Sequence, residues 1–190
     1  MECASVAEIA LEAAPVLGGT SLELSGNRIV ERDDLAIVSI ATPLGGEEAL
    51  AEALRNGWSL DVPEPARSSL SGTVRAIRTS PDQMMLIFPH ATPDAEAVVQ
   101  ERLGGTGYTT DQTDSWIALE VAGPDTISAM ERICPLDLQS FEIGGTGRTV
   151  MEHIGAMAIR TGDDAFLLLS ASSSAGSFLH AVETSYRYVT

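Results

Sequence analysis

Cys134 is the first residue of this sequence whose side chain could act as a nucleophile. A catalytic cysteine needs an exposed thiolate, which a helix N-terminus or a neighbouring base stabilises. Cys134 instead lies at the C-terminal end of an expected helix, where it continues the apolar face formed by Ile127, Met130 and Ile133. This position predicts a buried, structural thiol.

The three histidines are His90, His153 and His180, and no two of them have the close spacing of a metal-binding motif. His90 falls in a polar loop, His153 at the end of an expected strand and His180 in the middle of an expected helix. A surface or structural role is predicted for each of them. The two cysteines, Cys3 and Cys134, allow neither a zinc-ligand spacing nor a disulfide framework.

The tetrapeptide Gly-Gly-Thr-Gly occurs at residues 104–107 and again at residues 144–147. A phosphate-binding loop lies between a strand and a helix, often with Lys-Ser or Lys-Thr at its end. The first copy follows an expected helix and the second precedes an expected strand, so both are predicted to be turns. Ser172, Ser173 and Ser174 open the last expected helix; capping of its backbone N–H groups explains them, with anion binding as the alternative.

Two acidic pairs, Asp33-Asp34 and Asp163-Asp164, fall in expected turns and are predicted to be solvated. Trp58 and Trp116 are predicted to anchor a core or an interface. The sequence shows no Ser-His-Asp set, no metal cluster and no dinucleotide fingerprint. We therefore expect no catalytic, cofactor-binding or metal-binding residue in this chain.

The chain has 190 residues and a formal charge of −16, with 27 acidic against 11 basic residues. Such a charge repels nucleic acids and anionic membranes, and it serves either solubility or a partner with a basic surface. Residues 1–19 lack the basic start of a signal peptide, and no apolar run reaches transmembrane length. Together with the low cysteine content, these features predict a cytoplasmic protein.

The stretch from Trp116 to Leu138 is the best-defined part of the pattern. A β-prone apolar segment is stopped by Gly123-Pro124-Asp125; a helix then begins at Pro124 and ends before Pro135. A similar order is expected upstream and downstream of this stretch. It consists of strands at 35–41, 73–79, 83–88, 148–153, 156–161 and 165–170, helices at 47–55, from the Thr92 cap and after Ser174, and a loop at 61–71.

The two halves of the sequence look like copies of each other. Ala41-Thr42-Pro43 corresponds to Ala122-Gly123-Pro124, and Ala76-Ile77-Arg78-Thr79 recurs as Ala158-Ile159-Arg160-Thr161 at almost the same offset along the chain. Each half reads β-α-β-β-α. The sequence therefore predicts an α+β fold of two ferredoxin-like repeats related by pseudo-twofold symmetry, with helices on one face of antiparallel sheets.

The N-terminal region differs from the rest, and two segments are expected: an arm at 1–33 and the duplicated domain at 34–190. In the arm, a short helix is predicted by the spacing of Val6, Ile9, Ala10, Ala13 and Leu17. Residues 21–30 alternate weakly, which favours an edge strand. We expect the arm to pack on the domain or on a neighbouring chain.

The residues that follow the helix expected to begin at Pro124 resemble those of a known family. Cys134-Pro135-Leu136-Asp137-Leu138 directly after a helix, followed by Phe141 and Arg148-Thr149, resembles the gamma subunit of heterotetrameric sarcosine oxidase. The resemblance extends from about Leu35 to the C-terminus and is a pattern of packing residues. It therefore indicates a family more directly than a chemistry.

The resemblance implies a non-catalytic subunit in a cytoplasmic complex with alpha, beta and delta chains. That family oxidises sarcosine to glycine with oxygen and produces hydrogen peroxide; with tetrahydrofolate it yields 5,10-methylenetetrahydrofolate. FAD, FMN, NAD, zinc and tetrahydrofolate are implied for the partner chains, and no cofactor for this one. The gamma chain is similar to the folate-binding domain of aminomethyltransferases, and the resemblance implies packing against the related region of the alpha chain.

Two other functions stay open at this point. A stand-alone folate-dependent aminomethyltransferase would need a pterin pocket with an acidic anchor and a positioned carboxylate, and such enzymes are much longer. A small-molecule regulatory module is the other alternative, because ferredoxin-like repeats often bind ligands between helix and sheet; that analogy rests on the fold alone.

Overall fold

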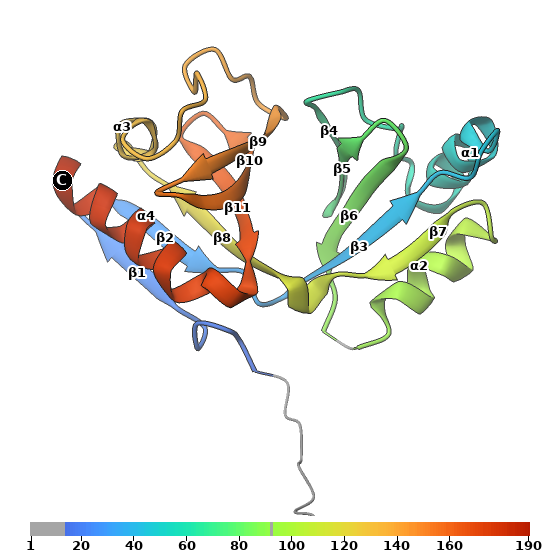
Figure 1. Cartoon of the computed structure of the whole chain (residues 1–190), viewed down its shortest axis with the longest axis horizontal. Coiled ribbons are helices and arrows are strands. Elements are labelled where there is room, and N and C mark those ends of the chain that lie inside the picture. The colour runs from blue at the N-terminus through green and yellow to red at the C-terminus, as the bar shows by residue number, and fades with distance from the viewer. Residues whose placement is uncertain (1–13, 92) are drawn as a thin grey trace, which may run out of the picture.

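The computed structural model describes residues 14–91 and 93–190. Two antiparallel sheets lie between helices, which cover their outer faces (Figure 1). The elements up to the second helix are β1 (Ser21–Leu24), β2 (Asn27–Glu31), β3 (Leu35–Ala41), α1 (Glu47–Trp58), β4 (Ser68–Ser71), β5 (Val74–Ser80), β6 (Gln83–Pro89) and α2 (Ala95–Leu103). The remaining elements are β7 (Tyr108–Asp111), β8 (Trp116–Ala122), α3 (Thr126–Glu131), β9 (Thr146–Met151), β10 (Ile154–Gly162), β11 (Ala165–Ala171) and α4 (Ala175–Val189), with 3₁₀ turns at Thr113–Ser115 and Ser172–Ser174.

The central strands are buried on both faces, which explains their nearly continuous apolar sequences. All residues of 84–88 in β6 and of 166–170 in β11 are buried. Alternate side chains point to the helices or to the other sheet, as the two-residue period of a strand requires. The side chains between the two sheets form one apolar cluster, which contains Ile37, Ile77, Met85, Ile87, Ala118, Met157, Ile159, Leu167 and Leu169.

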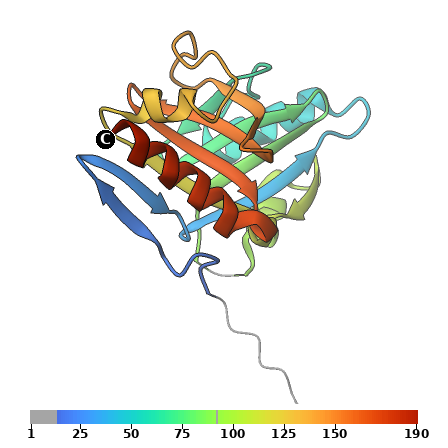
Figure 2. The same ribbon diagram turned by 60° about the vertical axis from the view of Figure 1, so that its left-hand side comes forward.

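The second half takes one strand from the N-terminal hairpin. The six-stranded sheet has the order β1-β2-β8-β11-β10-β9, and the five-stranded sheet has the order β4-β5-β6-β3-β7. β7 directly precedes β8 in sequence but pairs with β3, and β2 directly precedes β3 but pairs with β8. β7 therefore closes the sheet of the half to which it belongs in sequence, whereas the second half receives β2 from the N-terminal hairpin; Figure 2 shows β2 lying against the second half. With these strands, each half completes a β-α-β-β-α-β unit.

Arg78 and Arg160 play the same part in the two halves. Each lies at a β-bulge, between β5 and β6 or between β10 and β11. Arg78 donates to the carbonyl oxygens of Ser80 and Pro81, and Arg160 donates to those of Gly162 and Asp163. The repeated Ala-Ile-Arg-Thr segment is therefore a repeated structure, and the predicted fold of two ferredoxin-like repeats is confirmed.

The first half nevertheless contains one more strand than expected, whereas β9 of the second half was expected at 148–153. β4 lies in the segment that was predicted to be a loop at 61–71, and β9 is its counterpart. The second half also turns at a different place, because β9 and β10 are joined at Glu152 and His153 and not broken at Gly155. Glu152 and His153 have φ values of 45° and 67°, a left-handed conformation that their residue types did not indicate.

The helix boundaries differ as well. α1 continues through Asn56-Gly57 to Trp58, because Trp58 is buried in the core and its packing outweighs the low helix propensity of glycine. α3 begins at Thr126, later than the predicted Pro124, and ends at Glu131, before Cys134. The shorter α3 leaves residues 132–145 as a long connection to β9.

The described part of the N-terminal region is tied to the second half. The single strand expected at 21–30 is a hairpin, with a turn at Ser25-Gly26 between β1 and β2. The Glu31 carboxylate, only 5% exposed, accepts hydrogen bonds from the backbone N–H groups of Leu17, Gly19 and Thr20. The helix predicted around Val6–Leu17 lies mostly outside the described residues, as do Cys3 and the expected cap Thr92.

We expect Glu31→Gln to lower the free energy of unfolding by about 2 kcal/mol, because an amide cannot accept all three backbone hydrogen bonds at this buried position. Urea unfolding at neutral pH measures the change. Glu23→Gln is the matched control, since Glu23 is exposed on β1 and its substitution is expected to change stability by less than about 0.5 kcal/mol. Equal effects of the two substitutions would contradict the assigned role of Glu31.

Tyr186 gives a second test of the packing, between α3 and α4. Its hydroxyl donates to Thr126 Oγ1 at 2.9 Å, and burial raises the pKa of Tyr186 to about 12. The sequence contains no lysine, so tyrosines dominate titration between pH 10 and 12. The unfolded chain loses the phenolic proton first. The contribution of the neutral hydroxyl is therefore complete below pH 10 and is lost as the pH rises through about 12.

Tyr186→Phe is therefore expected to cost about 1 kcal/mol at pH 7, where the hydrogen bond is lost. Between pH 10 and 12 the wild-type chain should lose about 2 kcal/mol more than the variant, so the order of stability reverses. Urea unfolding of both proteins at stepped pH measures this difference. Parallel pH profiles would show that Tyr186 is not held in its neutral form.

Candidate functional site

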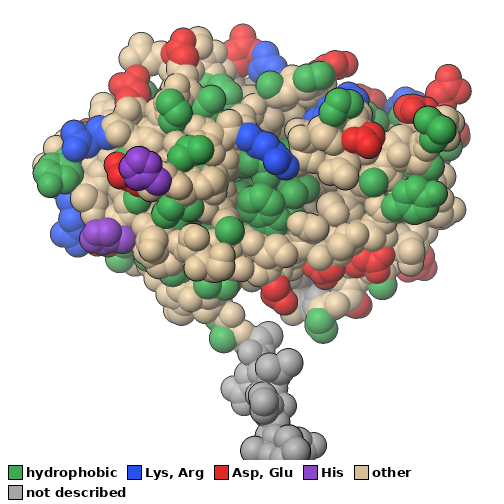
Figure 3. All heavy atoms as spheres, in the orientation of Figure 1, with side chains coloured by type: hydrophobic (Ala, Val, Ile, Leu, Met, Phe, Trp, Pro, Cys, Tyr) green, Lys and Arg blue, Asp and Glu red, His purple; other side chains and the backbone are tan. Residues whose placement is uncertain are grey.

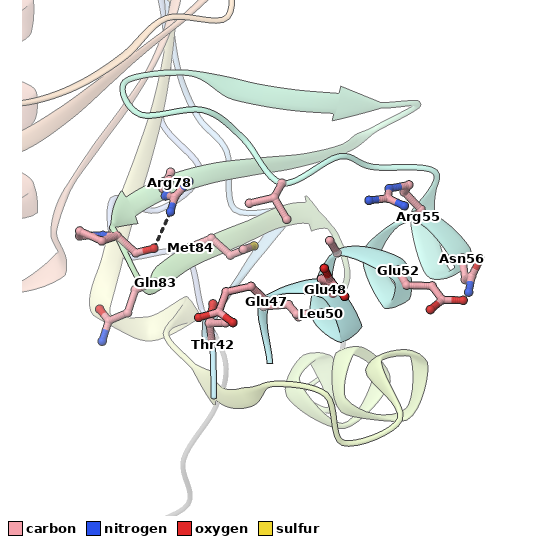
Figure 4. A pocket seen from close by; sticks show the side chains of 13 residues that line it. Thr42, Glu47, Glu48, Leu50, Glu52, Arg55, Asn56, Arg78, Gln83 and Met84 are labelled. Atoms are coloured by element: carbon pink, nitrogen blue, oxygen red, sulfur yellow. Dashed lines mark hydrogen bonds between the residues drawn. The ribbon is translucent and has the colours of Figure 1, made fainter. Parts of the chain in front are cut away.

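One cavity of the described chain lies beside α1 in the first half. It has a volume of about 820 Å³ and lies between α1 and the turn that joins β5 to β6 (Figure 4). Apolar side chains form its floor, and polar or charged side chains form its rim. The lining residues are Thr42, Glu47, Glu48, Leu50, Ala51, Glu52, Arg55, Asn56, Val62, Arg78, Pro81, Gln83 and Met84.

The sequence of α1 explains why its acidic side chains face this cavity. Leu50, Leu54 and Trp58 are buried on one face of the helix, which leaves the polar face to the solvent and the cavity. Glu47 and Glu48 lie in the first turn, where the helix dipole favours negative charge. The glutamates therefore stabilise the helix whether or not anything binds beside them.

Arg78 forms the opposite wall, but its guanidinium is already engaged. Besides Ser80 and Pro81, it donates to the carbonyl oxygen of Pro63 at 3.5 Å, and Figure 4 shows its hydrogen bond to Pro81. Met84, 3% exposed, lies on the floor between Arg78 and the helix. Arg78 therefore ties the β5–β6 turn to the connection after α1 and does not provide a free positive charge.

The rim of the cavity carries excess negative charge. Glu47, Glu48 and Glu52 form no ion pair with any described residue, whereas Arg55 is paired with Asp61 at 3.2 Å. Carboxylates on an apolar floor can bind a cationic group. They are not combined with a nucleophile or a histidine in the lining, so the arrangement favours binding over reaction.

A smaller cavity, of about 360 Å³, lies between the inner faces of the two sheets. Tyr108, Trp116 and Arg148 contribute to its lining. Trp116 Nε1 is buried and has no hydrogen-bond partner among the described residues. Figure 3 shows a basic side chain above an apolar patch near the middle of the face in view.

Of the cysteines, histidines, acidic pairs and tryptophans that the sequence analysis considered, only Trp116 lines either of the two cavities. Cys134 is buried, with its Sγ 3.8 Å from Thr149 Oγ1. His90 contacts Asp94 through Nε2 at 2.7 Å, whereas His153 and His180 are exposed on the β9–β10 turn and on α4. Within residues 14–91 and 93–190, no three His, Cys, Asp or Glu side chains are placed to hold a metal ion.

The first glycine-rich segment is a turn as predicted, whereas the second passes from a turn at Gly144 into β9, which begins at Thr146. Gly104 ends α2 in the left-handed conformation, and Gly107 allows a close approach, since a Cβ there would lie 2.8 Å from Ile40 Cγ2. In the second segment, a Cβ on Gly147 would lie 2.9 Å from Leu136 Cδ1. Both segments therefore serve chain geometry and packing.

The three serines do not cap α4 through their side chains, contrary to expectation. They form the 3₁₀ turn before the helix, and the Ser172 hydroxyl donates to the carbonyl oxygen of Asp114 at 2.7 Å. This bond ties the turn to the segment between β7 and β8. The hydroxyl is therefore engaged by the chain itself.

The acidic pairs and Trp58 have structural surroundings. Asp33, Asp163 and Asp164 are exposed in turns. Asp34 lies beside Arg32, and hydrogen bonding from that guanidinium holds the pKa of Asp34 below its ordinary value. The Arg102 guanidinium lies 5.4 Å from the centre of the Trp58 ring.

Sequence reasoning missed Glu47, Glu48, Glu52 and Met84 as parts of one site. The glutamates read as the solvated face of a helix and Met84 as a strand core residue, and the cavity appears only when both elements are placed.

In the described part of the chain, no helix is long and apolar enough to span a membrane.

The corresponding place in the second half is covered by the chain itself. Arg160 and Phe166 take the register positions of Arg78 and Met84. Phe141, from the long connection after α3, stacks on Phe166 with 6.5 Å between the ring centres, and its carbonyl oxygen accepts a hydrogen bond from Arg160. The first half has no such aromatic residue over Met84 among its described residues.

Comparison with known proteins agrees with this architecture. The chain is 28% identical over 131 residues and 29% identical over 126 residues to two sarcosine oxidase gamma subunits, which come from Corynebacterium sp. (strain P-1) and from Arthrobacter sp., respectively. The alignments cover 68% and 65% of this chain, but only 64% and 61% of the relatives. The resemblance predicted from the sequence is confirmed. No protein-family model matches the chain.

Solved structures share the fold. Heterotetrameric sarcosine oxidase from Corynebacterium sp. U-96 matches with a TM-score of 0.74 and 20% identity, covering 85% of this chain and 84% of the matched chain. The glycine cleavage system aminomethyltransferase T from Bartonella henselae matches with a TM-score of 0.59 and 13% identity, covering 80% of this chain and 44% of the enzyme. The duplicated α+β architecture is thus the one found in both proteins.

The covering role of Phe141 can be tested by truncation. Phe141→Ala is expected to lower the free energy of unfolding by about 2 kcal/mol, less than for a fully buried phenylalanine because Phe141 is only partly buried. Urea unfolding measures the loss. Ile143→Ala on the same connection is the control; this side chain is 55% exposed, and a change below about 0.5 kcal/mol is expected. A loss for Phe141→Ala no larger than for the control would show that the connection does not pack as described.

Proposed function

We propose that this chain is the gamma-type subunit of a heterotetrameric sarcosine oxidase. The observation that carries the proposal is its similarity to two sarcosine oxidase gamma subunits, together with the fold shared with that oxidase. The complex would oxidise sarcosine with oxygen to glycine and hydrogen peroxide, and with tetrahydrofolate it would form 5,10-methylenetetrahydrofolate. The partners would be the alpha, beta and delta subunits, in the cytoplasm.

The described side chains support a role without chemistry of its own. Cys134 is buried, the three histidines lie in separate places, and the larger cavity is lined by carboxylates that have no nucleophile or histidine beside them. FAD, FMN, NAD, zinc and tetrahydrofolate would accordingly be bound by the partner chains. This chain would contribute packing, next to the folate-type domain of the alpha subunit.

The many apolar side chains that pack within the chain fit this role. Both sheets are covered on the outside by helices and on the inside by each other, so most apolar side chains stabilise the subunit itself. The charge of −16 would keep such a subunit soluble before assembly and would favour partners with basic surfaces.

Isolation of the tagged chain from its native cells tests the proposal. We expect three further chains to co-purify in equal amounts, with flavin absorption and with sarcosine-dependent formation of hydrogen peroxide. The chain purified alone should show no flavin absorption and no turnover. Sarcosine oxidation, or one-carbon transfer to tetrahydrofolate, by the isolated chain would contradict a non-catalytic role and favour the aminomethyltransferase alternative.

A further inference from the structure

The cavity beside α1 is the open counterpart of a site that the chain covers in its other half. In the first half, α1 is 12 residues long and leads through residues 59–67 to β4. In the second half, α3 has only six residues, and the longer connection places Phe141 on Phe166. The two halves therefore treat the same position differently: one fills it with an aromatic side chain, and the other leaves a cavity of about 820 Å³.

The floor of the cavity matches what Phe141 contacts in the second half. Met84 replaces Phe166, and Arg78 replaces Arg160, at equivalent positions beside the same β-bulge. Arg160 lies 5.8 Å from the centre of the Phe166 ring and donates to the Phe141 carbonyl. A methionine floor accepts aromatic and aliphatic side chains of varied shape, because its thioether is flexible and polarizable.

The acidic rim of the cavity favours an incoming group that carries positive charge. Glu48 and Glu52 project from the exposed face of α1, with Glu47 at its start (Figure 4). Since these three carboxylates have no ionic partner among the described residues, an incoming group gains most if it is basic. A volume of about 820 Å³ exceeds a single side chain and suits a short peptide segment.

We propose that this cavity receives a segment of a partner protein chain, with an aromatic or large apolar side chain over Met84 and an arginine or lysine beside the α1 glutamates. The inference rests on the proposed function in so far as the partner is another chain of the oxidase. It assigns to the first half an intermolecular version of the contact that Phe141 makes within the chain.

Filling the cavity tests the apolar part of the proposal. Ala51→Phe places a ring in the space where the partner side chain would sit, and the matched control Ala97→Phe adds the same ring to the exposed face of α2. The four-chain complex is isolated through a tag on this chain, and affinity is measured by titrating the variant against the complex lacking it. Ala51→Phe is expected to weaken binding by about 30-fold or more, as for a lost central anchor, and Ala97→Phe by less than about threefold.

Reversing charge tests the basic part. Glu48→Lys combined with Glu52→Lys should weaken binding by about tenfold or more at low salt, with a smaller effect at high salt. Glu101→Lys combined with Glu96→Gln changes the charge of the neighbouring helix α2 by three units, against four for the α1 pair, and should have little effect. Thermal unfolding of each purified chain shows whether a variant is folded, and Ala51→Phe is expected to unfold within a few degrees of wild type.

The outcomes separate the two proposals. If the wild-type chain forms no complex, the proposed function fails. If the complex forms and folded Ala51→Phe and Glu48→Lys/Glu52→Lys chains bind like wild type, or if the α2 controls weaken binding equally, the docking site is wrong while the function stands. Binding of free sarcosine to the isolated chain, abolished by Ala51→Phe, would also overturn the inference, because the cavity would then hold a small molecule.

Discussion

The apolar contact between the inner faces of the two sheets is the interaction on which the rest of this structure depends. Ile37, Ile77, Met85 and Ile87 of the first half meet residues such as Ile159 and Leu167 of the second, and each sheet covers the inner face of the other. β2, which directly precedes β3 of the first half in sequence and pairs with β8 of the second, joins the halves in addition. Two ferredoxin-like units that would separately leave one sheet face open thus become a single folding unit with four layers.

The repeat could be predicted because its structural arginines are visible in sequence. Arg78 and Arg160 lie in the same tetrapeptide, and each bonds the carbonyl oxygens of its own bulge and of the connection after the preceding helix. The strands and helices that bury apolar side chains with a regular period were predicted for the same reason. The regular spacing of apolar residues and the repetition of a tetrapeptide can both be read from a single sequence.

Other features depend on tertiary contacts that the sequence does not display. β4 has the sequence Ser-Ser-Leu-Ser and is a strand because it pairs with β5 at the sheet edge, without an apolar pattern of its own. The pairing of β2 with β8 could not be deduced, since β2 directly precedes β3 of the first half along the chain but lies in the sheet of the second. The cavity beside α1 was missed for a similar reason: the exposed glutamates look like any solvated helix face until Met84 and Arg78 are placed opposite them.

The two halves have diverged where they do not contact each other. At the inter-sheet face both keep large aliphatic side chains, but on the outer side one half combines a long α1 with a short connection and the other a short α3 with a long one. In the second half, Phe141 covers the apolar side chain of Phe166. In the first half, the equivalent Met84 lies beneath a cavity with an acidic rim. A duplicated fold can in this way keep one copy self-contained and adapt the other for contact, because changes on the outer layer leave the shared core intact. This difference between the halves gives the proposed docking site its apolar floor and acidic rim, in a cavity whose described lining holds no cysteine or histidine.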